Sequence, residues 1–183
     1  MTANPFLSPS ELPYRLPDFA AVRDEHYLPA FEQGVAEHLA EVDAIVRNPE
    51  PATFDNTIAA LERSGATLKR VEVVLHTLTG SDATDGIREI EERIVPLAAR
   101  HRDAISLKRE LWARVQQVTT DDPQESWLLE RYRLDFVKAG ADLGDQEQER
   151  LRELNARLAE LGTEFSRNVV KATSENALVT NAV

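Results

Sequence analysis

The chain has 183 residues, of which 42% are hydrophobic and 29% charged, and it contains no cysteine. This composition is typical of a soluble protein with a packed core, and the lack of thiols excludes disulfides, cysteine nucleophiles and Cys-based zinc sites. The formal net charge of −11 disfavours nucleic acid or an anionic membrane as a partner.

The N-terminus lacks the features of a secretory signal. No basic residue precedes Arg15, and no apolar h-region follows. No segment approaches the roughly 18 apolar residues of a membrane span. We therefore expect a cytoplasmic protein with no membrane partner.

Residues 1–23 are predicted to form an extended arm. Pro5, Pro9, Pro13 and Pro17 each remove a backbone donor and push the preceding residue out of helical space. We expect this arm to lie over the body of the protein. Its predicted anchors are the large apolar side chains of Phe6, Leu7, Leu12, Tyr14 and Phe19.

A helical domain is predicted over residues 24–171, and apolar residues spaced by three and four mark its first two helices. The first helix runs from about Asp24 to Arg47. The second is capped by Thr53 and ends at Gly80, and Gly65 inside it is expected to mark a close helix contact. The stripe of the first helix is Leu28, Phe31, Val35, Leu39, Val42 and Val46.

Two further helices follow. Pro96 lies in the middle of the third helix, where it should remove one hydrogen bond and bend the axis. Ser106 is expected to cap a short fourth helix that carries Leu111 and Trp112. The stripe of the third helix is Ile87, Ile90, Ile94, Leu97, His101 and Ile105.

The fifth helix has the clearest start. Asp122, Pro123 and Glu125 supply a capping acceptor, a proline at the first helical position and a reciprocal glutamate. The sixth helix covers residues 145–171. Its apolar seam consists of Leu151, Leu154, Leu158, Leu161, Phe165 and Val169.

The seam of the sixth helix needs a long partner. We expect it to pack inside the bundle, as in other chains with short loops. The alternative is self-association through helix 145–171, which would give a dimer that is lost when Leu158 becomes charged.

These elements predict an all-α fold: a helical bundle of about six helices with a proline-rich N-terminal arm and a truncated tail. Residues 172–183 form that tail, and the stretch from Asn176 resembles the start of a strand. Because nothing upstream is predicted to pair with it, we expect the strand to continue in a longer parent protein.

A search for chemistry finds no site. None of the four histidines, His26, His38, His76 and His101, belongs to an H-E-x-x-H motif. The pairs Glu72/His76 and His38/Glu41 supply two ligands each, which do not complete a metal site. There is no G-x-S-x-G elbow and no glycine-rich phosphate loop. We therefore predict no catalytic, cofactor-binding or metal-binding residue in this chain.

Several motifs resemble the N-terminal region of the thimet-oligopeptidase-like zinc peptidases, in particular the peptidyl-dipeptidase and oligopeptidase A group. They include Asn4-Pro5-Phe6-Leu7, the segment from Glu25 to Phe31, and the segment from Asn48 to Thr57. Further matches at 60–65, 101–105, 129–132, 135–140 and 165–169 extend the resemblance over nearly the whole chain.

The resemblance implies a non-catalytic domain of a zinc-dependent oligopeptidase that hydrolyses short peptides. Such a domain walls the substrate channel, while zinc and the catalytic residues belong to a C-terminal part that is absent here. The fragment alone is then expected to be inactive. The alternative is a free-standing helical adaptor that binds a peptide or protein, in keeping with the acidic surface and the leucine seam.

Overall fold

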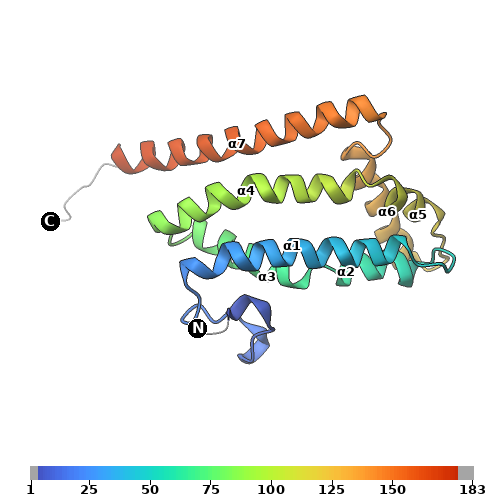
Figure 1. Cartoon of the computed structure of the whole chain (residues 1–183), viewed down its shortest axis with the longest axis horizontal. Coiled ribbons are helices and arrows are strands. Elements are labelled where there is room, and N and C mark those ends of the chain that lie inside the picture. The colour runs from blue at the N-terminus through green and yellow to red at the C-terminus, as the bar shows by residue number, and fades with distance from the viewer. Residues whose placement is uncertain (1–3, 177–183) are drawn as a thin grey trace.

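The computed structural model describes residues 4–176, which form seven α-helices and no strand. This confirms the predicted all-α bundle, although seven helices replace about six. In Figure 1, α7 and α4 lie above α1 and α3, and α5 and α6 gather at one end. The helices are α1 (Asp24–Val46), α2 (Ala60–Arg63), α3 (Ala66–Thr79), α4 (Asp85–Ser106), α5 (Arg109–Gln117), α6 (Pro123–Lys138) and α7 (Asp145–Glu175).

The extra helix arises at Gly65. The segment predicted as one helix from Thr53 to Gly80 is a π-helical turn at Phe54–Ala59, followed by α2 and α3. Gly65 has a φ of 71°, which only glycine adopts without strain, so the chain turns there. The predicted close contact is confirmed, because a Cβ on Gly65 would lie 2.9 Å from Nδ1 of His38.

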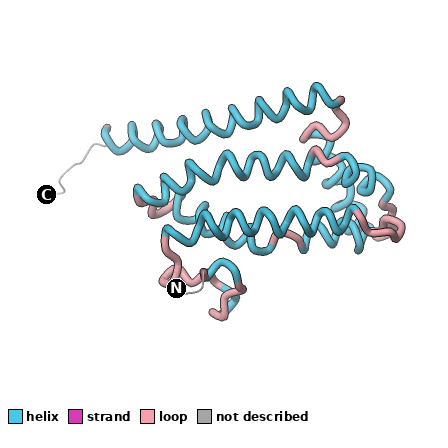
Figure 2. The backbone as a smooth tube through the Cα atoms, in the orientation of Figure 1, coloured by secondary structure: helices cyan, strands magenta, loops and turns pink. Residues whose placement is uncertain are grey.

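Two apolar cores fill the bundle, and short loops connect their helices (Figure 2). The first lies between α1, α3 and α4, where Tyr27 and Phe31 are fully buried. The second joins the end of α1 to α5 and α6 around Leu111 and Trp112. Helices α1 and α3 approach closely at Gly34, because a Cβ there would lie only 2.7 Å from the backbone nitrogen of Leu68.

The arm is anchored by one of its five predicted residues. Phe6 is buried in the first core, with its ring centroid 4.9 Å from that of Tyr27, and Arg70 donates to its carbonyl oxygen at 2.8 Å. The prediction is wrong for the other four, which are at least 40% exposed. These are Leu7, Leu12, Tyr14 and Phe19. Leu7 belongs to the single turn that packs on α1 and α3, but its side chain is not buried there, and the other three residues lie outside this turn.

Side-chain caps mark the starts of α4, at Thr84, and of α6, at Asp122. Oδ1 of Asp122 accepts hydrogen bonds from the backbone N–H groups of Gln124 and Glu125, at 2.8 and 3.0 Å, which confirms the predicted start of α6. The Glu125 carboxylate does not return the bond, since it accepts from Thr120 instead. Ser106 is the last residue of α4 and not the cap of α5, because the chain stays helical through it.

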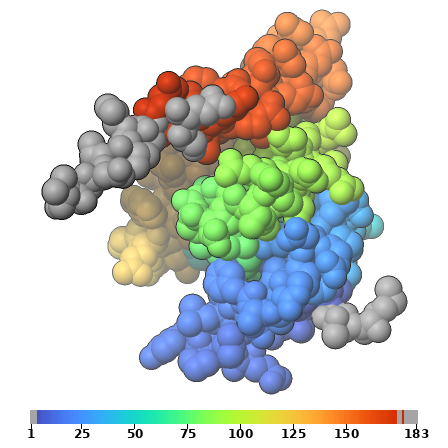
Figure 3. Space-filling model, turned by 90° about the vertical axis from the view of Figure 1, so that its left-hand side faces the viewer, coloured from blue at the N-terminus to red at the C-terminus, as the bar shows by residue number. Residues whose placement is uncertain are grey.

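Helix α7 lies along α4 at the edge of the bundle, as Figure 3 shows in space-filling form. Asn155 donates to Asp103 at 2.9 Å, and Arg167 forms an ion pair with Glu92 at 2.6 Å. The helix reaches Glu175, four residues into the predicted tail. The predicted strand beyond Asn176 falls in residues 177–183, outside the described part of the chain.

Candidate functional site

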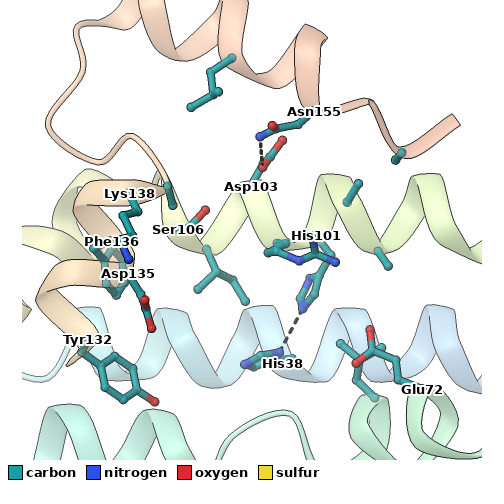
Figure 4. A pocket seen from close by; sticks show the side chains of 18 of the residues that line it. His38, Glu72, His101, Asp103, Ser106, Tyr132, Asp135, Phe136, Lys138 and Asn155 are labelled. Atoms are coloured by element: carbon teal, nitrogen blue, oxygen red, sulfur yellow. Dashed lines mark hydrogen bonds between the residues drawn. The ribbon is translucent and has the colours of Figure 1, made fainter. Parts of the chain in front are cut away.

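A groove of about 910 Å³ lies beneath the first half of α7 (Figure 4). Residues of α1 and α4 lie at its centre, α6 forms one side, and Leu151, Leu158 and Ala159 of α7 form another. The groove therefore brings together side chains from both halves of the chain. Because it combines apolar walls with convergent polar groups, it has the character of a ligand site.

A chain of hydrogen bonds crosses this groove. Oγ of Ser64 donates to the carbonyl oxygen of Leu61 at 2.6 Å and lies 3.0 Å from Nε2 of His38. Nδ1 of His38 lies 3.0 Å from Nε2 of His101. Because the Ser64 proton is already used, His38 donates from Nε2 and accepts at Nδ1, and His101 donates from Nε2.

In this tautomer Nδ1 of His101 carries no hydrogen. This atom is buried and has no hydrogen-bond partner, and the residue as a whole is only 8% exposed. Burial, together with the neighbouring His38, lowers the pKa of His101 to about 4. Burial also lowers the pKa of His38, against the pull of Glu41. Both rings are therefore neutral at physiological pH.

Sequence reasoning missed this pair, because 63 residues separate its members. The one available signal was the place of His101 in the apolar stripe of its helix. The two predicted Glu/His pairs form no site: Glu41 accepts from the backbone N–H of Gly65 at 2.7 Å, and His76 is exposed. Nδ1 of His26 accepts from the backbone N–H of Arg23 at the start of α1.

Charged and phenolic groups line the outer part of the groove. The hydroxyl of Tyr132 donates to Glu62 at 2.7 Å, and burial followed by this contact raises the pKa of Tyr132. Burial also raises the pKa of Glu72, although Arg102 opposes the effect. The groove thus offers acidic and basic side chains, which accept and donate hydrogen bonds, beside its apolar walls.

The groove does not have the donor set of a metal centre. Nowhere in residues 4–176 do three or more histidine or carboxylate side chains gather in a way that could hold an ion. The two histidines bond to each other, and Ser64 takes the remaining donor of His38. The described residues therefore do not fit zinc. No helix among them is long and apolar enough to cross a membrane.

No family model matches the chain, but it is similar in sequence to several bacterial peptidases. Dipeptidyl carboxypeptidase of Escherichia coli K12 is 36% identical over 188 residues, which cover 100% of this chain and 28% of that protein. Its counterpart in Salmonella typhimurium is 35% identical and is covered over 27% of its length. Oligopeptidase A of Salmonella typhimurium is 28% identical over 167 residues, or 87% of this chain and 24% of that protein.

The chain thus spans little more than a quarter of the length of these relatives. The similarity covers all of the chain and is not confined to one motif. Over its whole length the chain is therefore similar to one segment of these proteins, and it fits an N-terminal domain of a peptidase of the dipeptidyl carboxypeptidase and oligopeptidase A type.

Proposed function

We infer that this chain is the non-catalytic N-terminal domain of a zinc-dependent oligopeptidase of the peptidyl-dipeptidase type. The similarity of the entire chain to about 28% of dipeptidyl carboxypeptidase carries this inference. In the parent protein the substrates are short peptides, and the domain forms one wall of the channel that admits them. A cytoplasmic location without nucleic-acid partners is in keeping with the net charge of −11.

The chemistry of hydrolysis belongs to the rest of the parent. The 183-residue sequence has no H-E-x-x-H motif, and its described residues offer no three-ligand cluster. We therefore assign no catalytic, cofactor-binding or metal-binding role to any residue here. Zinc in the parent would activate the attacking water from ligands outside this chain.

The groove is the part of this domain best suited to contact a peptide. A peptide backbone needs donors and acceptors along its length, and its side chains need apolar contacts. Tyr132 and Lys138 supply polar groups, while Phe136 and Leu158 supply apolar surface in the same groove. A wall of this kind holds an unfolded peptide without fixing one sequence.

Peptidase assays test the proposal directly. The purified chain should not cleave a fluorescence-quenched peptide in the presence of added zinc, whereas full-length dipeptidyl carboxypeptidase of Escherichia coli serves as the positive control. Turnover by the chain that a chelator abolishes and zinc restores would contradict the proposal. Sequencing the source gene onward should reveal an H-E-x-x-H motif in the same reading frame.

A second candidate function is a free-standing helical adaptor that binds a peptide or protein. The observation that favours it is the exposed apolar face of α7 beside a groove of about 910 Å³. A stop codon directly after Val183 in the source gene would support the adaptor and exclude the domain. Binding of labelled peptides that weakens with Tyr132→Phe, but not with Tyr14→Phe at a fully solvated position, would locate the adaptor's site in the groove.

A further inference from the structure

The pair of His38 and His101 joins three parts of the fold beside the groove. His38 lies on α1, His101 lies on α4, and Ser64 lies in the turn between α2 and α3. The centroids of the two rings are 5.0 Å apart, and one nitrogen of each ring meets the other at 3.0 Å. We call these three residues the histidine latch, because their contacts connect α1, α4 and the turn.

The latch has places for two ring protons but not for three. Of its four ring nitrogens, one meets Ser64, two share the contact between the rings, and Nδ1 of His101 has no partner. Two neutral rings carry two protons, which occupy the contact and the bond to Ser64. A third proton either places two N–H groups face to face at 3.0 Å or creates a buried donor without an acceptor.

The neighbouring carboxylates do not accept that third proton's hydrogen bond. Glu41 on α1 favours a charge on His38, but its Oε2 accepts from the backbone N–H of Gly65 at 2.7 Å. Glu62 on α2 accepts from Tyr132. Within residues 4–176, the other charged groups of the groove form no hydrogen bond with either ring. They come from α3, α4 and α6 and are Glu72, Arg102, Asp103, Arg131, Asp135 and Lys138.

The groove beside His101 offers its ring a second position. The residue is 8% exposed and lines the groove of about 910 Å³ (Figure 4). Rotation about the side-chain bonds between staggered positions changes the direction of the ring. A ring that enters the groove meets water and shares the space with the carboxylates of Glu72 and Asp103. An imidazolium is therefore solvated in the groove, whereas the latch leaves it without an acceptor.

We propose that the histidine latch is an acid-operated switch within the folded chain. The closed latch holds two neutral rings between α1 and α4. Acid opens the latch, because the protonated ring of His101 leaves the contact and enters the groove. The groove then gains a positive charge at its centre while the helices remain folded.

The pH range of the switch is bounded on both sides. Burial and the neighbouring His38 lower the pKa of His101 to about 4 in the closed latch. A solvated imidazole has a pKa of about 6.5. Since a proton binds more tightly in the open position, the closed form persists above pH 6.5 and is replaced as the pH falls toward 4. Neither histidine belongs to the two apolar cores, so the change does not require their side chains to separate.

The switch also affects ligands of the groove, and this consequence rests on the proposed function. A peptide with acidic side chains gains an ionic partner when the imidazolium enters the groove. By linkage, binding of such a peptide favours the open latch to the same extent. A neutral peptide of the same length has no such gain.

Nitrogen-15 NMR of the histidine side chains of the 183-residue chain tests the switch. At pH 7.5 we expect both His38 and His101 as neutral rings that carry their hydrogen on Nε2. On acidification the signals of His101 should become those of an imidazolium, with a midpoint between pH 6.5 and pH 4, while far-UV circular dichroism stays constant. A ring that remains neutral until the helical signal is lost overturns the proposal.

A variant separates the contact from burial alone. His38→Ala removes the partner of His101, and the released ring should bind a proton about tenfold more tightly than in the wild type. His76→Ala, at an exposed position on α3, is the matched control and should leave the midpoint of His101 unchanged. An unchanged midpoint in His38→Ala contradicts the latch. The titration of the wild type decides the question if this variant does not fold.

Peptide binding distinguishes failure of the switch from failure of the proposed function. A fluorescein-labelled acidic peptide should bind at least about threefold more tightly at pH 5.5 than at pH 7.5, and its glutamine counterpart should not. His101→Phe should remove the difference. If the NMR titration shows the switch and neither peptide binds, the peptide-binding role of the groove is wrong and the switch stands. If the acidic peptide binds equally at both pH values while the imidazolium forms, the ring does not enter the groove and the proposal is wrong.

Discussion

Nε2 of His101 on α4 lies 3.0 Å from Nδ1 of His38 on α1, across the centre of the groove. The two rings are held in defined tautomers because Ser64 donates its only proton to a backbone carbonyl. A proton added to the buried Nδ1 of His101 creates an N–H donor that has no acceptor within hydrogen-bond distance. This relationship makes the junction of α1 and α4 sensitive to acid.

We therefore predict that the free energy of unfolding falls with acidification between about pH 6.5 and pH 4. The pKa of His101 is about 4 in the folded chain and 6.5 when unfolded, so the unfolded state binds more protons in this window. The stabilisation is fully present above pH 6.5 and amounts to on the order of 3 kcal/mol. Urea titrations at successive pH values measure it.

Two variants separate this effect from the titration of carboxylates. His101→Leu should flatten the pH dependence while lowering stability at neutral pH, because His38 loses its donor. His76→Gln removes an exposed histidine and should leave the wild-type slope intact. Equal slopes in all three proteins would contradict the role of the histidine pair.

We predict that Arg114, beside the second core, contributes strongly to the stability of the fold. Its side chain is buried and donates to Thr57 Oγ1 at 3.1 Å, to the carbonyl oxygens of Asn48 and Glu50, and to Asn56 Oδ1. Arg114→Met removes the donor from Thr57 Oγ1 and from the two carbonyl oxygens, while Asn56 Oδ1 still accepts from Thr53 and Thr57. The variant should cost about 3 kcal/mol in urea denaturation.

The control for this variant is Arg47→Met. Arg47 forms an exposed ion pair with Asp43, and such pairs contribute at most about 1 kcal/mol. Comparable losses in the two variants would mean that the buried hydrogen bonds of Arg114 are not the source of its effect.

Gly65→Ala should destabilise the fold by about 1–3 kcal/mol. The new Cβ would be strained at a φ of 71° and would collide with the ring of His38. Gly80→Ala, at a helix end with negative φ, is the control and should change little. Thermal unfolding followed by circular dichroism distinguishes the two, and equal melting temperatures would contradict the prediction.

Asp122→Ala should cost about 1 kcal/mol, the usual contribution of a helix N-cap. The carboxylate accepts from two backbone N–H groups at the start of α6, and no other group in the described contacts replaces it. Asp121→Ala, at the exposed neighbouring position, keeps the cap and removes the same charge. If both variants lose equal stability in urea, the effect is one of charge and not of capping.

The sequence by itself determined the all-α fold, the starts of α1, α6 and α7, and the absence of a zinc-peptidase motif. These features depend on local chemistry, such as the cap at Asp122 and the periodicity of the α7 seam. Resemblance in sequence also indicated the peptidase relatives, which share similarity over the whole chain.

Only the tertiary structure decided where the chain turns at Gly65 and which side chains meet in the groove. The contact of His38 with His101 joins residues 63 positions apart, so no local pattern contains it. The seam of α7 was predicted to pack within the bundle, yet most of its large apolar side chains are more than 40% exposed in the described part of the chain. Periodicity shows that a helix has an apolar face, but the arrangement of its neighbours decides whether that face is covered.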